Sequence, residues 1–431
     1  MSKEENRKNF SKYVSQNILG MIGFSCYVLA DSYFISIAKG ADGLTALNLV
    51  MPLYSIIFSI GEMIGVGSAI RYAISKIKKD ADADDYFWNA LIWCIMSSMI
   101  FVFAGIFFSS DIMRVLGADE HIVAVGNNYT KIFMCFAPMF MCNYVTNAFV
   151  RNDGAPGIAM SATLFSSLFN IVFDYILMFP MNLGMEGAAL ATALSPIIGM
   201  GICSIHFFSK KSSVRLVVCK PSVRKLVAGS QLGVSAFVGE MSSAVITLAF
   251  NFVILKLTGN VGVAAYGVVA NIAIVTTAVF NGVAQGSQPL ISSCFGRGDK
   301  DGCTQLKRMG YTTAFVLAAV MYSILFIFAE QFVAVFNSEG SEMLRLYATE
   351  GVKLYFIGIF FAGINIVGGG AFSATEDAFK AAVVSVARGF VLILGAVFVM
   401  SALFGMTGVW LAYAVAEGIT TFIMLVMALR V

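Results

Sequence analysis

The sequence predicts an all-α polytopic membrane protein with twelve transmembrane helices in two six-helix lobes. First, 58% of its 431 residues are hydrophobic and only 12% are charged, whereas about a quarter of the residues of a soluble protein carry a charge. Second, the mean hydropathy of +0.83 is spread over the whole chain, so the membrane part is most of the protein. Third, the apolar segments repeat in two matching halves.

Twelve apolar stretches are long enough to cross the hydrocarbon core as helices. Only the polar segment around 210–225 is long enough to link two sets of six. We therefore divide the chain into an N-lobe at 1–208, a cytoplasmic linker at 209–226 and a C-lobe at 227–431. The expected spans are residues 14–38, 44–70, 86–108, 122–148, 157–181, 186–208, 227–255, 262–292, 306–329, 345–371, 380–403 and 407–429.

The distribution of Lys and Arg predicts the orientation of these spans, because cytoplasmic loops carry an excess of both. With the N-terminus inside, most of the 28 Lys and Arg fall on the cytoplasmic side, Arg151 and Arg388 among them. The residues expected on the outer side are Lys39, Arg114, Lys256 and Arg345. We expect an integral protein of the plasma (inner) membrane with both termini in the cytoplasm.

An internal repeat relates the two halves. A shift of 219 residues places Gly40 on Gly259, and a shift of 221 places Gly184 on Gly405. Each half has an even number of spans, so the halves share one orientation and are related by a pseudo-two-fold axis along the membrane normal. A cavity between two such lobes is the expected substrate site.

Acidic residues within the expected spans are candidates for function, because an ionisable side chain near the bilayer centre costs a few kcal/mol. They are Asp31, Glu62, Asp174, Glu240 and Glu417. A structural role is the alternative for some of them. Asp31 could cap the loop that follows its helix, and Glu62 and Glu417 could each be neutralised by a Ser, Thr or Lys of a neighbouring helix.

Asn170 and Asp174 are four residues apart and therefore lie on one face of a helix. Oxygen ligands of this kind select hard cations, whereas a buried carboxylate beside a second carboxylate can carry a proton at neutral pH. The residues alone leave both possibilities open. The repeat places Val391 and Gly395 at the matching positions, so we predict an ion site in the N-lobe only.

Several function classes are not supported by any motif. There is no GxxxxGK[ST] loop for ATP, no HExxH and no GxSxG, and the eight cysteines form no CxxC pair. The basic residues are scattered, which argues against a nucleic-acid partner. We expect no catalytic residue, no cofactor and no tightly bound metal, and we expect an ion gradient to supply the energy.

Four segments resemble the multidrug and toxic compound extrusion (MATE) family. Members of that family have twelve helices in two lobes and export cationic and amphiphilic compounds in exchange for H⁺ or Na⁺. The resemblance covers nearly the whole chain, in order. The segments are LADSYFISIAKGADGLTALNLVMP at 29–52, AFVRNDGAPGIAM at 148–160, FNIVFDYILMFPMNLGMEGAALATALS at 169–195 and GVAQGSQPLISSCFGRGD at 282–299.

The resemblance implies an N-lobe cation site. Similar members build it from an Asp on the first helix, an Asn and an Asp on the fifth, and a Thr on the sixth. The matching residues here are Asp31, Asn170, Asp174 and Thr192. They are expected to bind H⁺ or Na⁺.

The resemblance also implies residues of the substrate cavity. Two Asn on the fourth helix match Asn143 and Asn147, and a C-lobe Glu on the seventh helix of other members matches Glu240. Glu62 and Glu417 complete the expected cavity. The tenth-helix acid of those other members is absent, since that stretch offers only an Asn, and this weakens the case for a complete cation site in the C-lobe.

The predicted function is secondary active multidrug efflux by alternating access, with cationic or amphiphilic small molecules as substrates. Membrane lipid is the other expected partner, and no obligate protein partner is expected. A lipid-linked saccharide flippase of similar two-lobed architecture is the alternative. Its pyrophosphate-bearing substrate would need Arg or Lys in the cavity, whereas the intramembrane charges expected here are mainly acidic.

Overall fold

The computed structural model describes residues 3–336 and 341–429, and the regular elements in these ranges are helical. The first half contains α1 (Lys3–Lys78), α2 (Asp85–Val115), α3 (Glu120–Cys135), α4 (Ala137–Asn152), α5 (Pro156–Met178) and α6 (Gly184–Phe207). The second half contains α7 (Val223–Gly296), α8 (Lys300–Ile327), α9 (Ala329–Phe336), α10 (Glu342–Tyr355), the 3₁₀ turn η1 (Phe356–Gly358), α11 (Ile359–Ala374), α12 (Ala378–Val386), the π-helical segment η2 (Ala387–Val391) and α13 (Leu392–Leu429).

Three of these helices are each two helices joined at a glycine with left-handed backbone conformation. Gly40 in α1, Gly259 in α7 and Gly405 in α13 have φ angles of 59°, 67° and 59°. Glycine adopts such angles at little cost because it has no Cβ atom. The repeat pairs Gly40 with Gly259, and it pairs Gly405 with Gly184, whose φ is 52°. The two halves therefore share backbone turns as well as a sequence pattern.

The helices have the lengths that twelve spans require. Within the described residues, nine are long and apolar enough to cross a membrane, and α3 with α4, bent by 46°, would form a tenth. Two of the nine, α7 with 74 residues and the stretch Ala378–Ala428 with 51, are divided by a glycine bend and are long enough for two spans each. Large apolar side chains such as Ile100 and Phe107 are exposed on the outside, as expected of helices that face lipid.

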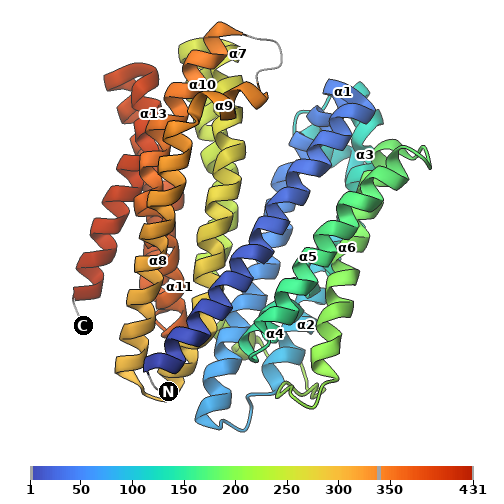
Figure 1. Cartoon of the computed structure of the whole chain (residues 1–431). Coiled ribbons are helices and arrows are strands. Elements are labelled where there is room, and N and C mark those ends of the chain that lie inside the picture. Colours follow the sequence, from blue (N-terminus) through green and yellow to red (C-terminus); the bar gives the residue numbers. More distant parts are fainter. Residues whose placement is uncertain (1–2, 337–340, 430–431) are drawn as a thin grey trace.

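The helices form two lobes, α1–α6 and α7–α13, with both ends of the chain on the same side (Figure 1). Each lobe has an apolar core of its own. The largest cluster of buried apolar side chains comes from the second lobe, apart from Phe10 and Val14 of α1. Another cluster, which extends from Ile35 to Ala189, lies entirely within α1–α6.

The two lobes meet along α1 and α7, toward the side of the chain ends. The backbones approach closely because small residues line the contact: a Cβ atom at Gly67 would lie 2.2 Å from the carbonyl oxygen of Gly229. At the same side, Lys78 Nζ lies 3.4 Å from Glu376 Oε2, which joins α1 to the loop before α12. The lobes are thus closed against each other on this side.

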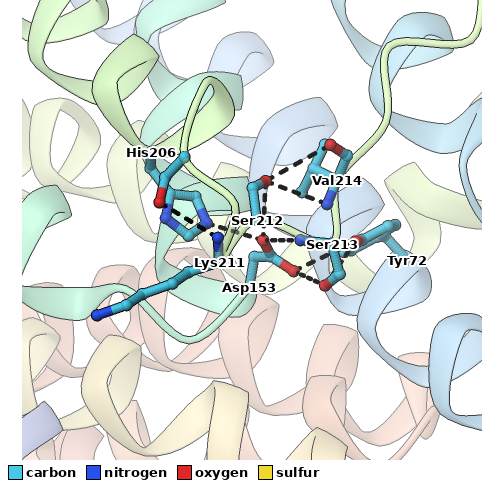
Figure 2. Close-up of polar contacts among 8 residues, drawn as sticks. Tyr72, Asp153, His206, Lys211, Ser212, Ser213 and Val214 are labelled. Atoms are coloured by element: carbon cyan, nitrogen blue, oxygen red, sulfur yellow. Dashed lines mark hydrogen bonds and ion pairs between the residues drawn. The ribbon is translucent and has the colours of Figure 1, made fainter.

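The connection between the lobes, residues 208–222, is held against the N-lobe (Figure 2). Asp153, which follows α4, is the anchor. Its Oδ2 atom accepts a hydrogen bond from His206 Nε2 at 2.8 Å and another from the backbone N–H of Ser213 at 2.9 Å. Its Oδ1 atom accepts a hydrogen bond from the Tyr72 hydroxyl at 3.3 Å. These hydrogen bonds fix the linker to the surface of the N-lobe.

Candidate ion and substrate site

The four residues expected to bind an ion lie together in the N-lobe. Asp31 comes from α1, Asn170 and Asp174 come from α5 one turn apart, and Thr192 comes from α6. All four side chains are buried, and even Asp31 is only 6% exposed. The carboxylates of Asp31 and Asp174 lie close enough to interact electrostatically.

The close packing of α5 and α6 positions three of these residues. A Cβ atom at Gly187 would lie 2.7 Å from the backbone carbonyl carbon of Leu177, so only glycine permits this approach. Pro156 opens α5 at a position where its missing N–H costs no hydrogen bond. From this start, the helical period brings Asn170 and Asp174 to the face that contacts α6.

The Asn170 amide links the acid to the threonine. With its oxygen turned toward Thr192, it accepts hydrogen bonds from Thr192 Oγ1 at 3.1 Å and from the Thr192 backbone N–H at 3.2 Å. In the same orientation, Asn170 Nδ2 donates to Asp174 Oδ2 at 3.1 Å. This orientation satisfies both ends of the amide.

One oxygen of each aspartate has no partner among the residues that the structure describes. Asp31 Oδ1 and Asp174 Oδ1 are both buried, and neither accepts a hydrogen bond from any described residue. A buried charged oxygen without a partner is costly, so these atoms fit a bound proton or a small cation with oxygen ligands. The described part of the chain has no group of three or more His, Cys, Asp or Glu suited to a metal ion.

None of these four residues lines the first cavity, of about 110 Å³, but Tyr27, Ser167 and Ser195, each one helical turn from one of them, do. Asn143 and Asn147 of α4 both line it, where the sequence expected them. Asn147 Nδ2 donates to the carbonyl oxygen of Ala159 and to Thr163 Oγ1, each at 3.1 Å, whereas Asn143 Oδ1 is buried without a partner. The aromatic and sulfur side chains of the lining are Met21, Phe24, Tyr27, Phe58, Phe140, Tyr144 and Met160.

A second cavity, of about 80 Å³, continues into the C-lobe. Glu62 and Glu240 line both cavities, so the two acids stand where the cavities meet. Glu62 Oε1 accepts a hydrogen bond from Gln285 Nε2 at 3.2 Å. The carboxylate of Glu240 forms no ion pair or hydrogen bond with any residue described in the structure, so it can receive a ligand.

Arg151 is a lining residue that the sequence placed in the cytoplasm. Its side chain is 4% exposed, and it lines the first cavity. Arg151 Nη1 donates to Gln285 Oε1 at 2.6 Å and to Asn17 Oδ1 at 3.4 Å. Gln285 of the C-lobe thus bridges a base and an acid of the N-lobe.

Glu417 does not contribute to either of these cavities as the sequence expected. Its carboxylate is buried, 2% exposed, and pairs with Arg388, whose Nη2 donates to Oε1 at 2.7 Å and whose Nε donates to the same oxygen at 3.0 Å. Asn365 Nδ2 donates to Oε2 at 2.7 Å. The alternative of a neutralised structural acid fits Glu417, with Arg rather than Ser, Thr or Lys as the partner.

Arg388, which we expected among the basic residues of the cytoplasmic side, does not lie in a loop. The residue lies in the π-helical segment η2, inside the span expected at 380–403, and it lines the second cavity. A signal for this was present, because Arg388 stands eight residues inside an apolar run. The prediction assigned basic residues to loops by counting them. Such a count does not recognise an arginine that lies within a helix and pairs with a buried acid, as Arg388 does with Glu417.

Comparisons with known proteins agree with this architecture. The sequence model of the MatE family matches residues 17–176 and 236–399. The multidrug export protein MepA of Staphylococcus aureus (strain MRSA252) is 27% identical over 414 residues, which cover 93% of this chain and 89% of MepA.

Solved structures share the fold at low identity. One, described as an outward-facing conformation of a multidrug resistance MATE family transporter of the MOP superfamily, has a TM-score of 0.89 at 20% identity, covering 99% of this chain and 96% of that chain. A MOP superfamily transporter from Pyrococcus furiosus, described as having a binding pocket of reverse polarity, has a TM-score of 0.91 at 19% identity, covering 99% and 95%. The predicted fold class, an all-helical membrane protein in two lobes, is confirmed.

Proposed function

Because this chain belongs to the MatE family of membrane transporters, we propose that it exports cationic or amphiphilic compounds in exchange for H⁺ or Na⁺ by alternating access. One observation carries the proposal. Two buried aspartates have unpartnered oxygens beside a cavity whose central glutamate, Glu240, has no partner among the described residues. The name of the MepA relative, a multidrug export protein, supports the same function.

The N-lobe cluster is proposed as the coupling site. H⁺ or Na⁺ would bind the unpartnered oxygens of Asp31 and Asp174. Thr192 would supply a neutral oxygen ligand, and Asn170 would hold Asp174 and Thr192 in place. Either ion lowers the negative charge beside the cavity and thereby weakens the binding of a cationic substrate. A ligand shifts a two-state equilibrium only through different affinities for the two states, so the proposal requires the ion and the substrate to favour different states.

The substrate cavity offers three kinds of contact to an aromatic cation. Glu62 and Glu240 supply negative charge where the two cavities meet. Phe24, Tyr27 and the other aromatic side chains supply ring faces, to which cations are attracted. The methionines adapt to different shapes because their side chains are flexible, which suits a transporter of several compounds.

In the membrane, we take residues 1–208 and 227–431 as the two lobes that move, with both termini in the cytoplasm of a cell with an inner membrane. The contacts around Gly67 and Lys78 then close the cytoplasmic side. A cavity shut toward the cytoplasm corresponds to the state that releases substrate outward. Membrane lipid and the transported compounds are the only partners that this proposal needs.

A lipid-linked saccharide flippase is the second candidate, favoured by the two arginines that line the cavities. Arg151 is engaged by Gln285, however, and Arg388 by Glu417. The acids Glu62 and Glu240 between them oppose an anionic pyrophosphate. The flippase therefore ranks below the exporter.

The test uses proteoliposomes that contain a fluorescent cationic dye. Dye movement is recorded under an imposed proton gradient and then under an imposed sodium gradient, for the wild type and for Asp31→Asn. We expect one gradient to drive the dye and the substitution to stop it. The absence of gradient-driven movement with any cationic dye, together with binding of an anionic lipid-linked sugar, would favour the flippase.

A further inference from the structure

We propose that the C-lobe cavity holds a subsite for the carboxylate of a zwitterionic substrate, with Arg388 as its anchor. The inference rests on the proposed export function and adds a substrate class to it. The substrate carries an amine cation, which binds at Glu62 and Glu240, and a carboxylate, which reaches into the C-lobe.

The guanidinium of Arg388 has two edges, and Glu417 occupies one of them. The bonds to Glu417 use Nε and Nη2, which form the side-on edge of the group. Tyr413 is a further hydrogen-bonding neighbour. An arginine has five N–H donors. Glu417 takes one each from Nε and Nη2 and Tyr413 takes one more, so two donors remain on the terminal nitrogens. Arg388 lines the second cavity and keeps 16% of its side chain exposed.

A second buried group in the same cavity lacks a partner. Gln288 of α7 is 5% exposed and lines the C-lobe cavity, and its Oε1 atom forms no hydrogen bond with any described residue. A buried amide without a partner is unfavourable unless a ligand or water supplies one. Its N–H₂ group can donate to a carboxylate, and its oxygen can accept from a ligand N–H. The cavity therefore offers polar contacts beyond Arg388.

The repeat supports the placement of Arg388 in a cavity wall. A shift of 221 residues relates Arg388 to Ser167 and Glu417 to Pro196. Ser167 and Pro196 both line the N-lobe cavity. The ion pair thus stands in the C-lobe at positions whose N-lobe counterparts face a ligand cavity without any charge.

The charges of the cavity select a zwitterion over a simple anion. Glu62 and Glu240 line the same cavity as Arg388, so they repel a ligand that carries a carboxylate alone. A zwitterion brings its own cation to these acids and its carboxylate to the open edge of the guanidinium. Charge-assisted hydrogen bonds to arginine are among the strong ones, and arginine can hold a carboxylate with two parallel bonds.

The test compares two dyes that differ in one group, a rhodamine with a free carboxylate and the methyl ester of the same rhodamine. Fluorescence anisotropy gives the Kd of each dye for the purified full-length protein. Arg388→Lys keeps a cation for Glu417 but lacks the second edge of the guanidinium. We expect the Kd of the acid, relative to that of the ester, to rise about tenfold in this variant.

A second variant covers the case in which Arg388→Lys does not fold. The double substitution Arg388→Gln with Glu417→Gln removes both charges of the pair together, and the same rise in the ratio is expected. An unchanged ratio in the folded variants overturns the inference, and so does an equal weakening of both dyes.

The ester keeps this inference separate from the proposed export function. If the wild type neither binds the ester nor moves it under an ion gradient, the export function fails. If it does both and the ratio of the two Kd values still does not depend on Arg388, only the carboxylate subsite fails.

Discussion

The two lobes differ in the partners of their buried carboxylates. In the N-lobe, Asp31 and Asp174 each have a buried oxygen with no partner in the described structure. In the C-lobe, Glu417 is equally buried, yet Arg388 of the same lobe holds its carboxylate through Nε and Nη2. Asp174 lies on α5, which the repeat relates to the segment that contains Arg388, whereas Asp31 comes from α1.

We interpret this difference as that between the proposed site for a mobile ion and a fixed charge pair. A buried carboxylate is unfavourable without a cation, a proton or hydrogen-bond donors. Arg388 and Asn365 of the same lobe supply the cation and the hydrogen-bond donors for Glu417. The described residues supply no partner for the buried Oδ1 atoms of Asp31 and Asp174, so a proton or cation from solution would have to neutralise them. Coupling to an ion gradient requires such a site. Two lobes of the same architecture can thus differ: one would bind an exchangeable ion, and the other contains an arginine that neutralises its acid permanently.

The largest effect on transport is expected from Asp174→Asn. The substitution keeps the size of the side chain and removes the charge, so ion-driven dye transport should fall to the rate of protein-free vesicles. Folding should be retained, because the lost oxygen had no partner. Dye transport and size-exclusion elution measure the two properties, with the exposed Asp111→Asn as control. Normal transport in Asp174→Asn would break the comparison.

The largest effect on stability is expected from Arg388→Ala in the other lobe. Removing one partner of a buried ion pair leaves an uncompensated charge and costs about 3–5 kcal/mol. Thermal unfolding in detergent measures this loss, and Arg114→Ala, which removes an exposed arginine, is the control. The double substitution Arg388→Gln with Glu417→Gln should recover most of the stability. Equal stability of wild type and Arg388→Ala would mean that the pair does not hold the C-lobe together.

A smaller effect is expected from Thr192→Val. The hydroxyl of Thr192 is a neutral ligand candidate that contacts Asn170, so its loss should weaken ion binding by about tenfold. The measurement is the ion concentration that gives half-maximal dye transport. Thr420→Val is the matched control, because Thr420 is a buried C-lobe threonine whose hydroxyl donates within its own helix. The comparison would be weakened if both variants shifted the ion dependence equally.

Much of this fold follows from the sequence, because apolar length and the placement of glycine are local properties. The repeat pairs Gly40 with Gly259, and both break a helix with the same backbone conformation. The prediction of one span at 122–148 missed the bend of 46° between α3 and α4. That bend falls at Phe136, just before a proline at position 138, inside what reads as one apolar span.

The candidate site was predictable in part. Asp31, Asn170, Asp174 and Thr192 lie together as expected, and their role with an ion stays a prediction. Arg151 and Arg388 were counted among the basic residues of the cytoplasmic side, and their position in cavity walls was missed because that count assumes that every arginine side chain faces water. Arg151 is buried and Arg388 is 16% exposed. Long side chains from other helices supply their partners, Gln285 for Arg151 and Glu417 for Arg388. Such long-range pairs leave no mark in the local sequence.

The anchored linker has a kinematic consequence. Its path is fixed to the N-lobe as far as Ser222, whose backbone N–H donates to Asn89 Oδ1 at 2.7 Å. The next residues begin α7, so hardly any slack lies between the two lobes at this point. The lobes therefore cannot drift apart here, and any rocking motion has its pivot near residue 222. In the proposed orientation, displacement grows with distance from this pivot, so the cytoplasmic side opens at the parts of the lobe contact that lie farthest from residue 222.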